Sequence, residues 1–345
     1  MTKRSLALEW KPVLTIRPNF VGKRGEVQIS DALGQQRYKV RKRDLLDALC
    51  GDHPRTDHVL TSLKETGLLA KSWDPVETGS EGVEHWTSRN WTFALSYYLW
   101  SRRSMFLDEG EDYERIRCTA LRDMLDESNL PLPEPIKEEE AIQLPEAADL
   151  PENESVGEVL ANRVTTLAFS SGGKTDAALL HGLLFHGFSV SRPYHVPNVE
   201  DHIHNILHGV GFAFDPFLAI FDINGIEPGL YDYNISQDRL KLVKKGVFRK
   251  QISSGLIGHE QALTAACTVL LVADFRRFQW RYRHERALRN LYFDVGRMAQ
   301  YFILVSTAFG LKTHITPATV DDDLAKLLDI DPDERQVFHS ITLGF

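Results

Sequence analysis

A tyrosine among basic residues is the chain's clearest candidate for proton transfer. Tyr282 follows Arg281 in the run WRYRHER, which occupies residues 280–286. An arginine guanidinium stays protonated in proteins, so Arg281 cannot act as a base. Its positive charge can favour the phenolate form of the neighbouring phenol, which would leave Tyr282 as the proton-transfer group. The alternative is a solvated basic helix start without a catalytic role.

A second group of polar side chains follows an expected helix stop. Apolar residues recur at helical spacing over residues 288–309, and Gly310 predicts the end of that helix. The loop of residues 311–320 carries Lys312 and Thr313. A loop beside a helix end can present backbone amides and a cation to an anionic group. An ordinary polar exit loop after a buried helix would show the same pattern.

Two motifs that suggest other chemistry fail on inspection. The run SGGKTD lacks the first glycine of a phosphate-binding loop, because Ala168 stands at that position. Thr175 and Asp176 are expected instead to cap the helix that follows. His204 and His208 stand four residues apart, but no Cys or acidic residue at the required spacing completes a ligand set. The sequence therefore predicts no metal site.

The closing segment resembles the end of SagB-type flavin dehydrogenases, a branch of the nitroreductase-like proteins that includes azoline oxidases of ribosomal peptide maturation. That family pattern runs from a Tyr-bearing basic cluster through Asp-x-Gly-x-x-x-Gln on a helix to Gly-Leu and an acidic helix start. The matching residues are Tyr282, Arg289, Asp294, Gly296, Gln300, Gly310, Leu311 and Asp321 to Asp323.

The resemblance continues upstream and covers about residues 155–345. The strand-like run FLAIFDI ends at Asn224-Gly225, a strong turn dipeptide, and GLYDY then matches the family's hairpin. The resemblance implies an α+β class, with a nitroreductase-like FMN-binding fold built on a central mixed sheet with surrounding helices. It also implies that FMN lies at the interface of a homodimer, where Gln300 could serve the neighbour's site.

The resemblance assigns the flavin contacts to several segments. In the family's arginine-rich entry motif, Arg163, Thr165 and Phe169 match while two arginines are replaced. The resemblance implies that Arg163 binds the phosphate and Thr165 the polyol or phosphate. His208 and Gly209 stand where the family faces the flavin with Pro-Ser-Ala-Gly. In addition, Lys312 and Thr313 would bind the anion, and Thr319 would offer a backbone amide to the hydride-accepting nitrogen.

The function implied by the resemblance is FMN-dependent oxidation of a residue in a ribosomally made precursor peptide, of the azoline-to-azole type or a similar two-electron step. Azoline oxidases use a Lys-Tyr pair where this chain has Arg281-Tyr282. Tyr282 would equally suit the reverse reaction, reduction of a dehydrated Ser or Thr residue. The thinned arginine motif keeps a third hypothesis open, a non-catalytic precursor-binding scaffold with a decayed flavin domain. A general quinone or nitro-compound reductase is disfavoured by the amino-terminal pattern.

The first seventy residues show three strand-like runs followed by two helical stretches. This order is typical of a small winged-helix module, and it resembles the PqqD-like leader-recognition elements fused to peptide-modifying enzymes. In those elements a leader peptide adds as a strand beside the third strand and packs on the last helix. The residues expected to bind peptide are Arg37, Tyr38, Val40, His58, Thr61 and Ser62. A purely structural winged helix would have the same pattern.

Composition divides the chain into four expected parts. Residues 1–75 form the winged-helix-like module, and residues 76–130 form a helical connecting region. Residues 131–158 combine repeated Pro with many carboxylates, which predicts an exposed, semi-extended linker. Residues 159–345 form the nitroreductase-like FMN domain.

The overall composition narrows the class of protein. With 345 residues, 43% of them hydrophobic, and a formal net charge of -8, the chain predicts two soluble domains and no nucleic-acid partner. Neither a membrane-spanning stretch nor a signal peptide stands out, so a cytoplasmic location is expected. The three cysteines are widely spaced and predict no disulfide framework. The expected partners are a precursor peptide, a second copy of the chain and companion maturation enzymes.

Overall fold

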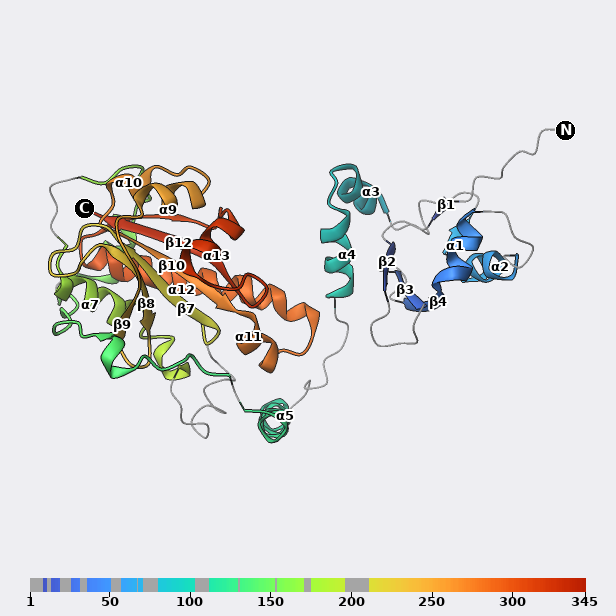
Figure 1. The fold of residues 1–345 in the computed structure, drawn as a ribbon, viewed down its shortest axis with the longest axis horizontal. Helices are drawn as coiled ribbons and strands as arrows, with labels where there is room; N and C mark the ends of the chain where they lie inside the picture. The colour runs from blue at the N-terminus through green and yellow to red at the C-terminus, as the bar shows by residue number, and fades with distance from the viewer. Residues whose placement is uncertain are drawn as a thin grey trace. The chain divides into compact units, whose positions relative to one another are not determined.

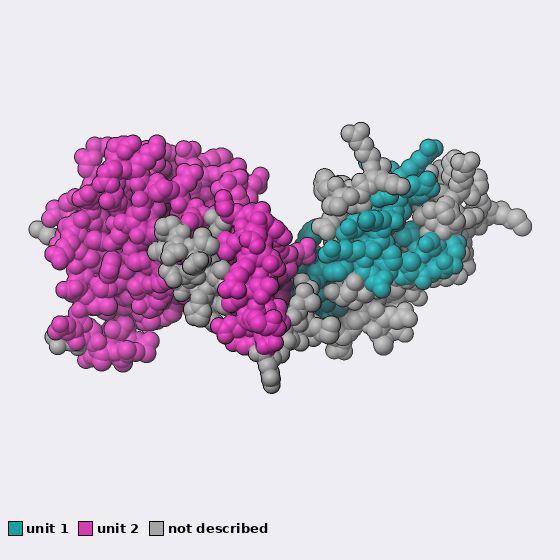
Figure 2. Space-filling model, turned by 90° about the horizontal axis from the view of Figure 1, so that it is seen from below, with its two compact units in different colours: residues 1–106 teal, residues 107–345 magenta. Residues whose placement is uncertain are grey.

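The computed structural model describes residues 9–10, 14–18, 26–31, 36–50, 57–66, 68–70, 80–102, 112–129, 131–152, 154–170, 175–195 and 211–345. The chain divides into two compact units, Met1–Phe106 and Leu107–Phe345, which Figure 2 colours separately. Each unit has its own buried apolar cluster. The division falls inside the expected helical connecting region of residues 76–130, so that region does not form a unit of its own.

The first unit contains a three-stranded sheet and two helical pairs. Its elements are β1 (Glu9–Trp10), β2 (Leu14–Pro18), β3 (Glu26–Asp31), β4 (Gln36–Arg41), α1 (Lys42–Cys50), α2 (Asp57–Glu65), β5 (Leu69–Ala70), α3 (Ser80–Ser88) and α4 (Thr92–Trp100). Strands β2, β3 and β4 pair antiparallel in that order. Ile29 and Leu45 pack with Leu63 and Leu68 of the second helical segment. The three strands and two helices expected from the sequence are therefore present.

The second unit is built on a seven-stranded sheet in the order β11-β12-β10-β7-β8-β9-β6 (Figure 1). Its strands are β6 (Ala141–Ile142), β7 (Phe214–Ile220), β8 (Gly229–Asn234), β9 (Arg239–Lys245), β10 (Cys267–Asp274), β11 (Lys312–Thr316) and β12 (Arg335–Gly344). These strands pair antiparallel, and an isolated parallel bridge joins Thr165 to Thr313. This bridge supplies the parallel element of the mixed sheet.

Helices cover both faces of this sheet. The helices of the second unit are α5 (Tyr113–Glu127), α6 (Val156–Asn162), α7 (Ala177–Gly187), α9 (Arg249–Gly255), α10 (Gln261–Thr264), α11 (Phe275–Arg281), α12 (Leu288–Ala308) and α13 (Asp321–Leu328). Short 3-10 turns lie at Glu138–Glu140, Arg192–Tyr194 and Glu285–Ala287. One face packs against α7, α11 and α12, and the other against α9, α10 and α13. Strands β7 and β10 are buried on both sides because alternate side chains enter opposite clusters.

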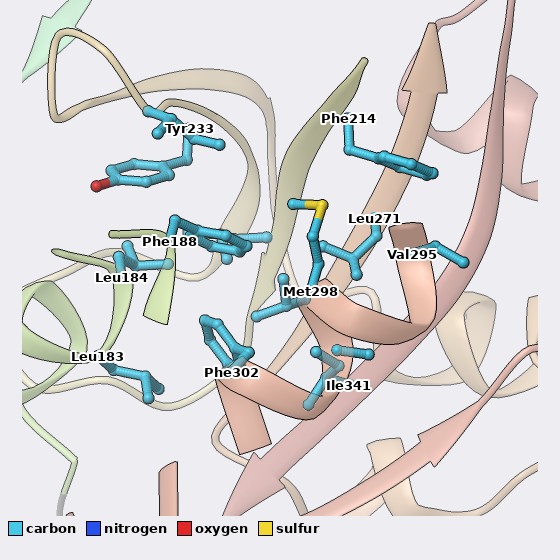
Figure 3. Close-up of a cluster of buried hydrophobic side chains, with 14 of the residues drawn as sticks. Leu183, Leu184, Phe188, Phe214, Tyr233, Leu271, Val295, Met298, Phe302 and Ile341 are labelled. Carbon is cyan, nitrogen blue, oxygen red and sulfur yellow. The ribbon is translucent and has the colours of Figure 1, made fainter. Parts of the chain in front are cut away.

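The long helix α12 forms the centre of the larger cluster. Figure 3 shows its Val295, Met298 and Phe302 among Phe188, Leu271 and other buried side chains. Gly310 follows the helix with φ 73°, a left-handed conformation that glycine adopts without steric cost. The helix and its stop therefore lie where the sequence predicts them.

The acidic segment of residues 131–158 is less free than the sequence suggests. Most of it is irregular, as expected, but Ile136 is buried and hydrogen-bonds through its amide and carbonyl to Gln237. Strand β6 then pairs with β9 at the sheet edge, and Ser155 and Glu158 form a capping box at the start of α6. Composition alone predicts that the entropy cost of ordering keeps this segment loose. Specific contacts with the β8–β9 hairpin offset that cost.

In the part of the chain that the structure describes, no helix is both long and apolar enough to cross a membrane.

Candidate functional site

Two segments far apart in the sequence meet at one corner of the large sheet. Thr165 bridges Thr313, the amide of Thr166 donates to the carbonyl of Thr313 at 2.9 Å, and Nδ1 of His314 lies 3.1 Å from the carbonyl oxygen of Thr166. The amide of Ser170 then donates to the terminal carbonyl of Phe345 at 2.6 Å. The structure thus brings together the upstream and downstream residues expected to bind flavin.

The charges at this corner have no counter-ions among the described residues. Arg163 closes α6 and is partly exposed, while Lys312 starts β11 and is exposed. Neither side chain forms a hydrogen bond or ion pair there. Thr165 is exposed and Thr313 is buried. Two free cations beside an exposed hydroxyl fit an anionic group such as the FMN phosphate.

Thr319 lies beyond the far end of β11, in the connection to α13. Its hydroxyl donates to a carboxylate oxygen of Asp321 at 2.5 Å, and the next amide, Val320, donates to the carbonyl of Gly255 at 2.7 Å. These bonds fix the connection against α9. The backbone role expected for Thr319 stays a prediction.

Tyr282 lies at the end of α11, which begins directly after β10. Asp274 caps the helix by accepting from the amide of Arg277, so the helix direction is set by the strand. The Tyr282 ring packs at 4.9 Å from the ring of Phe278 and 6.3 Å from that of Phe212. The guanidinium of Arg281 lies 4.8 Å from the centre of the Tyr282 ring. Tyr282 is therefore held in an aromatic pocket beside a cation.

Burial raises the pKa of the Tyr282 phenol, and the nearby charge of Arg281 only partly opposes this effect. The sequence predicts that Arg281 would favour the phenolate. The cation acts in that direction, as expected, but desolvation by burial outweighs it, so the pKa of Tyr282 is raised on balance. At neutral pH Tyr282 is a neutral phenol that can donate a proton.

Asp294 is a titratable neighbour of Tyr282 and Arg281. It matches the family motif in the sequence, but no role at the site was expected for it. It is 9% exposed on α12, and burial raises the pKa of its carboxyl despite opposition from Arg297 and the amide of Gly211. It also influences the pKa of both Tyr282 and Arg281. Its effect on these two groups depends on the packing of α12 against α11, which the local sequence does not show.

Gln300 lies on the exposed face of α12. It lines an open groove of about 650 Å³ together with Tyr292, Phe293, Gly296, Arg297, Tyr301 and Leu304. Phe293 is 69% exposed and Tyr292 is 59% exposed. Such a run of exposed aromatic side chains is unusual on a free surface and typical of a contact with another molecule.

A separate charged cluster lies at the start of β12. Arg277 is 1% exposed and forms ion pairs with Asp215 and Asp274, and Arg335 adds a second cation to Asp215 at 2.8 Å. The cluster borders a polar cavity of about 280 Å³ that also contains Asp232. Burial and the charge of Asp215 raise the pKa of Asp232 to about 6.

Residues 233–345 match the model of the nitroreductase family. The second unit contains a nitroreductase domain. The match includes Tyr282, Arg281, Gln300, Lys312 and Thr319, whereas Arg163 and Thr165 lie upstream of it.

Three curated relatives support this placement. The trifolitoxin operon protein TfxC of Rhizobium leguminosarum bv. trifolii is 30% identical over 108 residues, 31% of this chain and 30% of that protein. The trifolitoxin-processing protein TfxB of the same organism is 25% identical over 114 residues, 32% of this chain and 31% of that protein. MJ1384 of Methanocaldococcus jannaschii, provisionally named a nitroreductase, is 26% identical over 197 residues, 55% of this chain and 89% of that protein. The matched stretch is about a third of the length of either trifolitoxin protein.

Within one copy of the second unit, the Thr165–Thr313 bridge and the start of α11 lie near opposite ends of β12. Thr313 pairs with Leu343 near the end of β12, whereas Arg335 at its start pairs with Asp274, where α11 begins. The eight residue steps between those positions correspond to about 26 Å of strand. One copy therefore does not assemble all of the expected flavin residues in one place.

Two expected cofactor contacts, His208 and Gly209, lie outside the described residues. Among the expected peptide-binding residues, Arg37 is exposed and lies 4.8 Å from the ring of Trp100, while Tyr38 and Val40 turn toward the small core of the first unit. The remaining expected contacts are on α2, where Thr61 and Ser62 are exposed and the side chain of His58 lies outside the described residues. Strand β4 pairs only with β3 among the described strands, so its outer edge is open to an added strand.

Proposed function

We propose that this chain is an FMN-dependent oxidoreductase that acts on a residue of a ribosomally made precursor peptide. The nitroreductase domain and the relatedness to two proteins named for trifolitoxin support a redox role in peptide maturation. The observation that carries the proposal is Tyr282, a partly buried phenol held beside an unpaired guanidinium. Such a group is suited to moving a proton while a hydride moves elsewhere.

FMN, when bound, accepts or donates the hydride. Arg163 and Lys312 would hold its phosphate, because both cations are free and lie within a few residues of the Thr165–Thr313 bridge. Phe212 and Phe278 exclude water from Tyr282, which keeps the phenol proton from exchanging at random with solvent. Asp294 is the nearby carboxyl that could take up or supply that proton.

Oxidation of the azoline-to-azole type, or a similar two-electron step, is the first candidate because the azoline oxidases carry Tyr at this point. It requires a base, and a phenol with a raised pKa is almost entirely protonated at neutral pH, so Asp294 would have to accept the proton. The reverse reaction, reduction of a dehydrated Ser or Thr residue, is favoured by one observation. The raised pKa of Tyr282 keeps the phenol protonated and ready to protonate the α-carbon.

The complete site would require a second copy of the chain. The phosphate and proton-transfer residues are separated within one copy, and α12 exposes an aromatic groove that contains Gln300. Packing that groove against its equivalent would bury the aromatic residues and could bring one copy's Tyr282 to the other copy's corner. The open edge of β4 would meanwhile bind the leader of the precursor, and companion maturation enzymes would carry out the preceding steps.

The test uses purified full-length protein, FMN and the leader-bearing precursor encoded nearby. Tyr282→Phe should retain flavin absorbance and lose roughly two to four orders of magnitude in turnover, because only the proton-transfer group is removed. Tyr113→Phe, an exposed tyrosine on α5, is the matched control and should turn over normally.

Three results discriminate between the candidates. Protein that binds no flavin, even with FMN added, would overturn the enzyme and leave the precursor-binding scaffold. Unchanged turnover in Tyr282→Phe would remove that residue from the mechanism. Product masses two units below or above the starting peptide distinguish oxidation from reduction.

A further inference from the structure

Arg281 is a largely buried cation without a partner. Its Nη1 atom is closed off from solvent, and among the described residues this atom has no hydrogen-bond partner and the side chain forms no ion pair. The residue as a whole is only partly exposed. A guanidinium has five N–H donors, and burying it unpaired is costly. Some other group is therefore expected to offset this cost when the protein works.

The neighbouring side chains do not supply that group. Arg281 lies over the rings of Phe212 at 5.4 Å and Tyr282 at 4.8 Å, which gives a partial cation–π attraction. Asp294 is the carboxylate that acts on Arg281, and its oxygens are already 3.5 Å from Arg297 and accept from the amide of Gly211. Asp294 therefore stabilises Arg281 only through space.

Two further guanidinium groups act on the pair Arg281 and Tyr282. Arg117 on α5 and Arg297 on α12 both lower the pKa of Tyr282, and Arg117 also lowers the pKa of Arg281. Helix α5 is fixed near α11 by the packing of Leu121 on Trp280. A guanidinium has no acceptor atom, so neither of these cations can pair with the donors of Arg281.

We propose that Arg281 binds an oxyanion immediately beside Tyr282. The inference rests on the proposed function, because it concerns the same site. The ligand group would carry a planar or tetrahedral array of oxygens. The oxygens could belong to a carboxylate of the peptide substrate or to a phosphate of the cofactor from a second copy. A guanidinium recognises both through paired N–H donors.

Binding there would position the ligand relative to the phenol. Arg281 and Tyr282 are adjacent in the sequence, so an anion held by Arg281 would lie beside the Tyr282 ring. The rest of the ligand would then be held at a fixed distance from the hydroxyl of Tyr282. Arg281 is then a binding residue, and Tyr282 remains the only one of the pair that exchanges a proton.

Thermal unfolding of the full-length protein without added flavin tests the inference. Sodium acetate and sodium phosphate are titrated against sodium chloride at equal ionic strength. One of the two oxyanions should raise the Tm by roughly 2–5 °C at tenfold its dissociation constant. Arg281→Met should reduce this shift to whatever Arg163 and Lys312 contribute, and Arg281→Lys should reduce it less. Arg283→Gln is the matched control and should keep all of it, because Arg283 already pairs with Glu127.

A shift with acetate alone identifies a carboxylate ligand, and a shift with phosphate alone identifies a phosphate. Equal shifts in wild-type protein and Arg281→Met, or no shift with either anion, would overturn the inference. If Arg281→Met does not fold, a smaller shift in Arg281→Lys and a still smaller one in Arg281→Gln support the inference, and undiminished shifts in both variants overturn it. Because no flavin is present, failure of flavin binding in the separate assay leaves this result unaffected.

Discussion

Helix α11 carries two arginines one turn apart, Arg277 and Arg281. Both have enclosed guanidinium atoms, but they differ in the partners of their charge. Arg277 is 1% exposed, pairs with Asp215 and Asp274 and donates to the carbonyl of Phe212 at 3.2 Å. Arg281 has an equally enclosed Nη1 atom but no partner. Burial lowers the pKa of both, but the two carboxylates reverse this effect for Arg277, whose pKa is raised.

The difference separates a structural cation from a binding cation. Arg277 joins the start of α11 to β7 and β10, so its charge is used within the fold. The charge of Arg281 forms no ion pair with the described residues, so it is available to a ligand. The same contrast holds for the two carboxylates of the polar cavity, since Asp215 is paired with two arginines and Asp232 makes no ion pair.

The largest effect is expected from removing the paired arginine. Arg277→Met leaves Asp215 and Asp274 buried with only Arg335 to compensate them, which should lower the free energy of unfolding by about 3–5 kcal/mol. Urea denaturation monitored by tryptophan fluorescence measures it. Arg283→Gln, which breaks an exposed pair with Glu127, is the control and should change stability by less than about 1 kcal/mol. Equal losses in the two variants would contradict the structural role assigned to the charge of Arg277.

Much of the framework could be predicted from the sequence because its signals are local. The 3.6-residue apolar period and Gly310 determine α12 and its end, and Asn224-Gly225 marks the turn after β7. The corner of the candidate site was predicted only through family resemblance. Nothing local in the run around Arg163 shows that Thr165 pairs with a strand nearly 150 residues away.

The electrostatics of the site could not be predicted, because they depend on tertiary burial. The local sequence places Arg281 beside Tyr282 and suggests a lowered pKa, but Phe212, seventy residues upstream, supplies the desolvation that reverses the outcome. The acidic segment shows the same limitation, since Ile136 is buried by a hairpin that lies 100 residues farther along the chain.

An intermediate effect is expected from the unpaired carboxylate of the cavity. The pKa of Asp232 is about 6 in the folded protein, against about 3.9 in an unfolded chain. The associated stability is therefore present below pH 4 and is lost as the pH rises through 6. Asp232→Asn should raise the free energy of unfolding relative to wild type by about 1–3 kcal/mol at pH 8 and by much less at pH 4.5.

Urea denaturation at the two pH values measures this difference. Asp123→Asn, an exposed carboxylate on α5, should show no such pH-dependent gain. A gain for Asp232→Asn that is the same at both pH values would mean that Asp232 is already compensated, like Asp215.

The smallest effect is expected on the pKa of Tyr282, and it tests how the charge of Arg281 acts on that phenol. Arg281 lowers the pKa of Tyr282 against the larger opposite effect of burial, so Arg281→Met should raise that pKa further, by about one unit or less. Phenolate absorbance, taken as the difference between each protein and its Tyr282→Phe counterpart, isolates this one tyrosine. Arg283→Gln should leave the titration unchanged because the charge of Arg283 is taken up by Glu127. A lower pKa in Arg281→Met would show that Arg281 acts mainly by excluding water, and its charge would then not be the one available to a ligand.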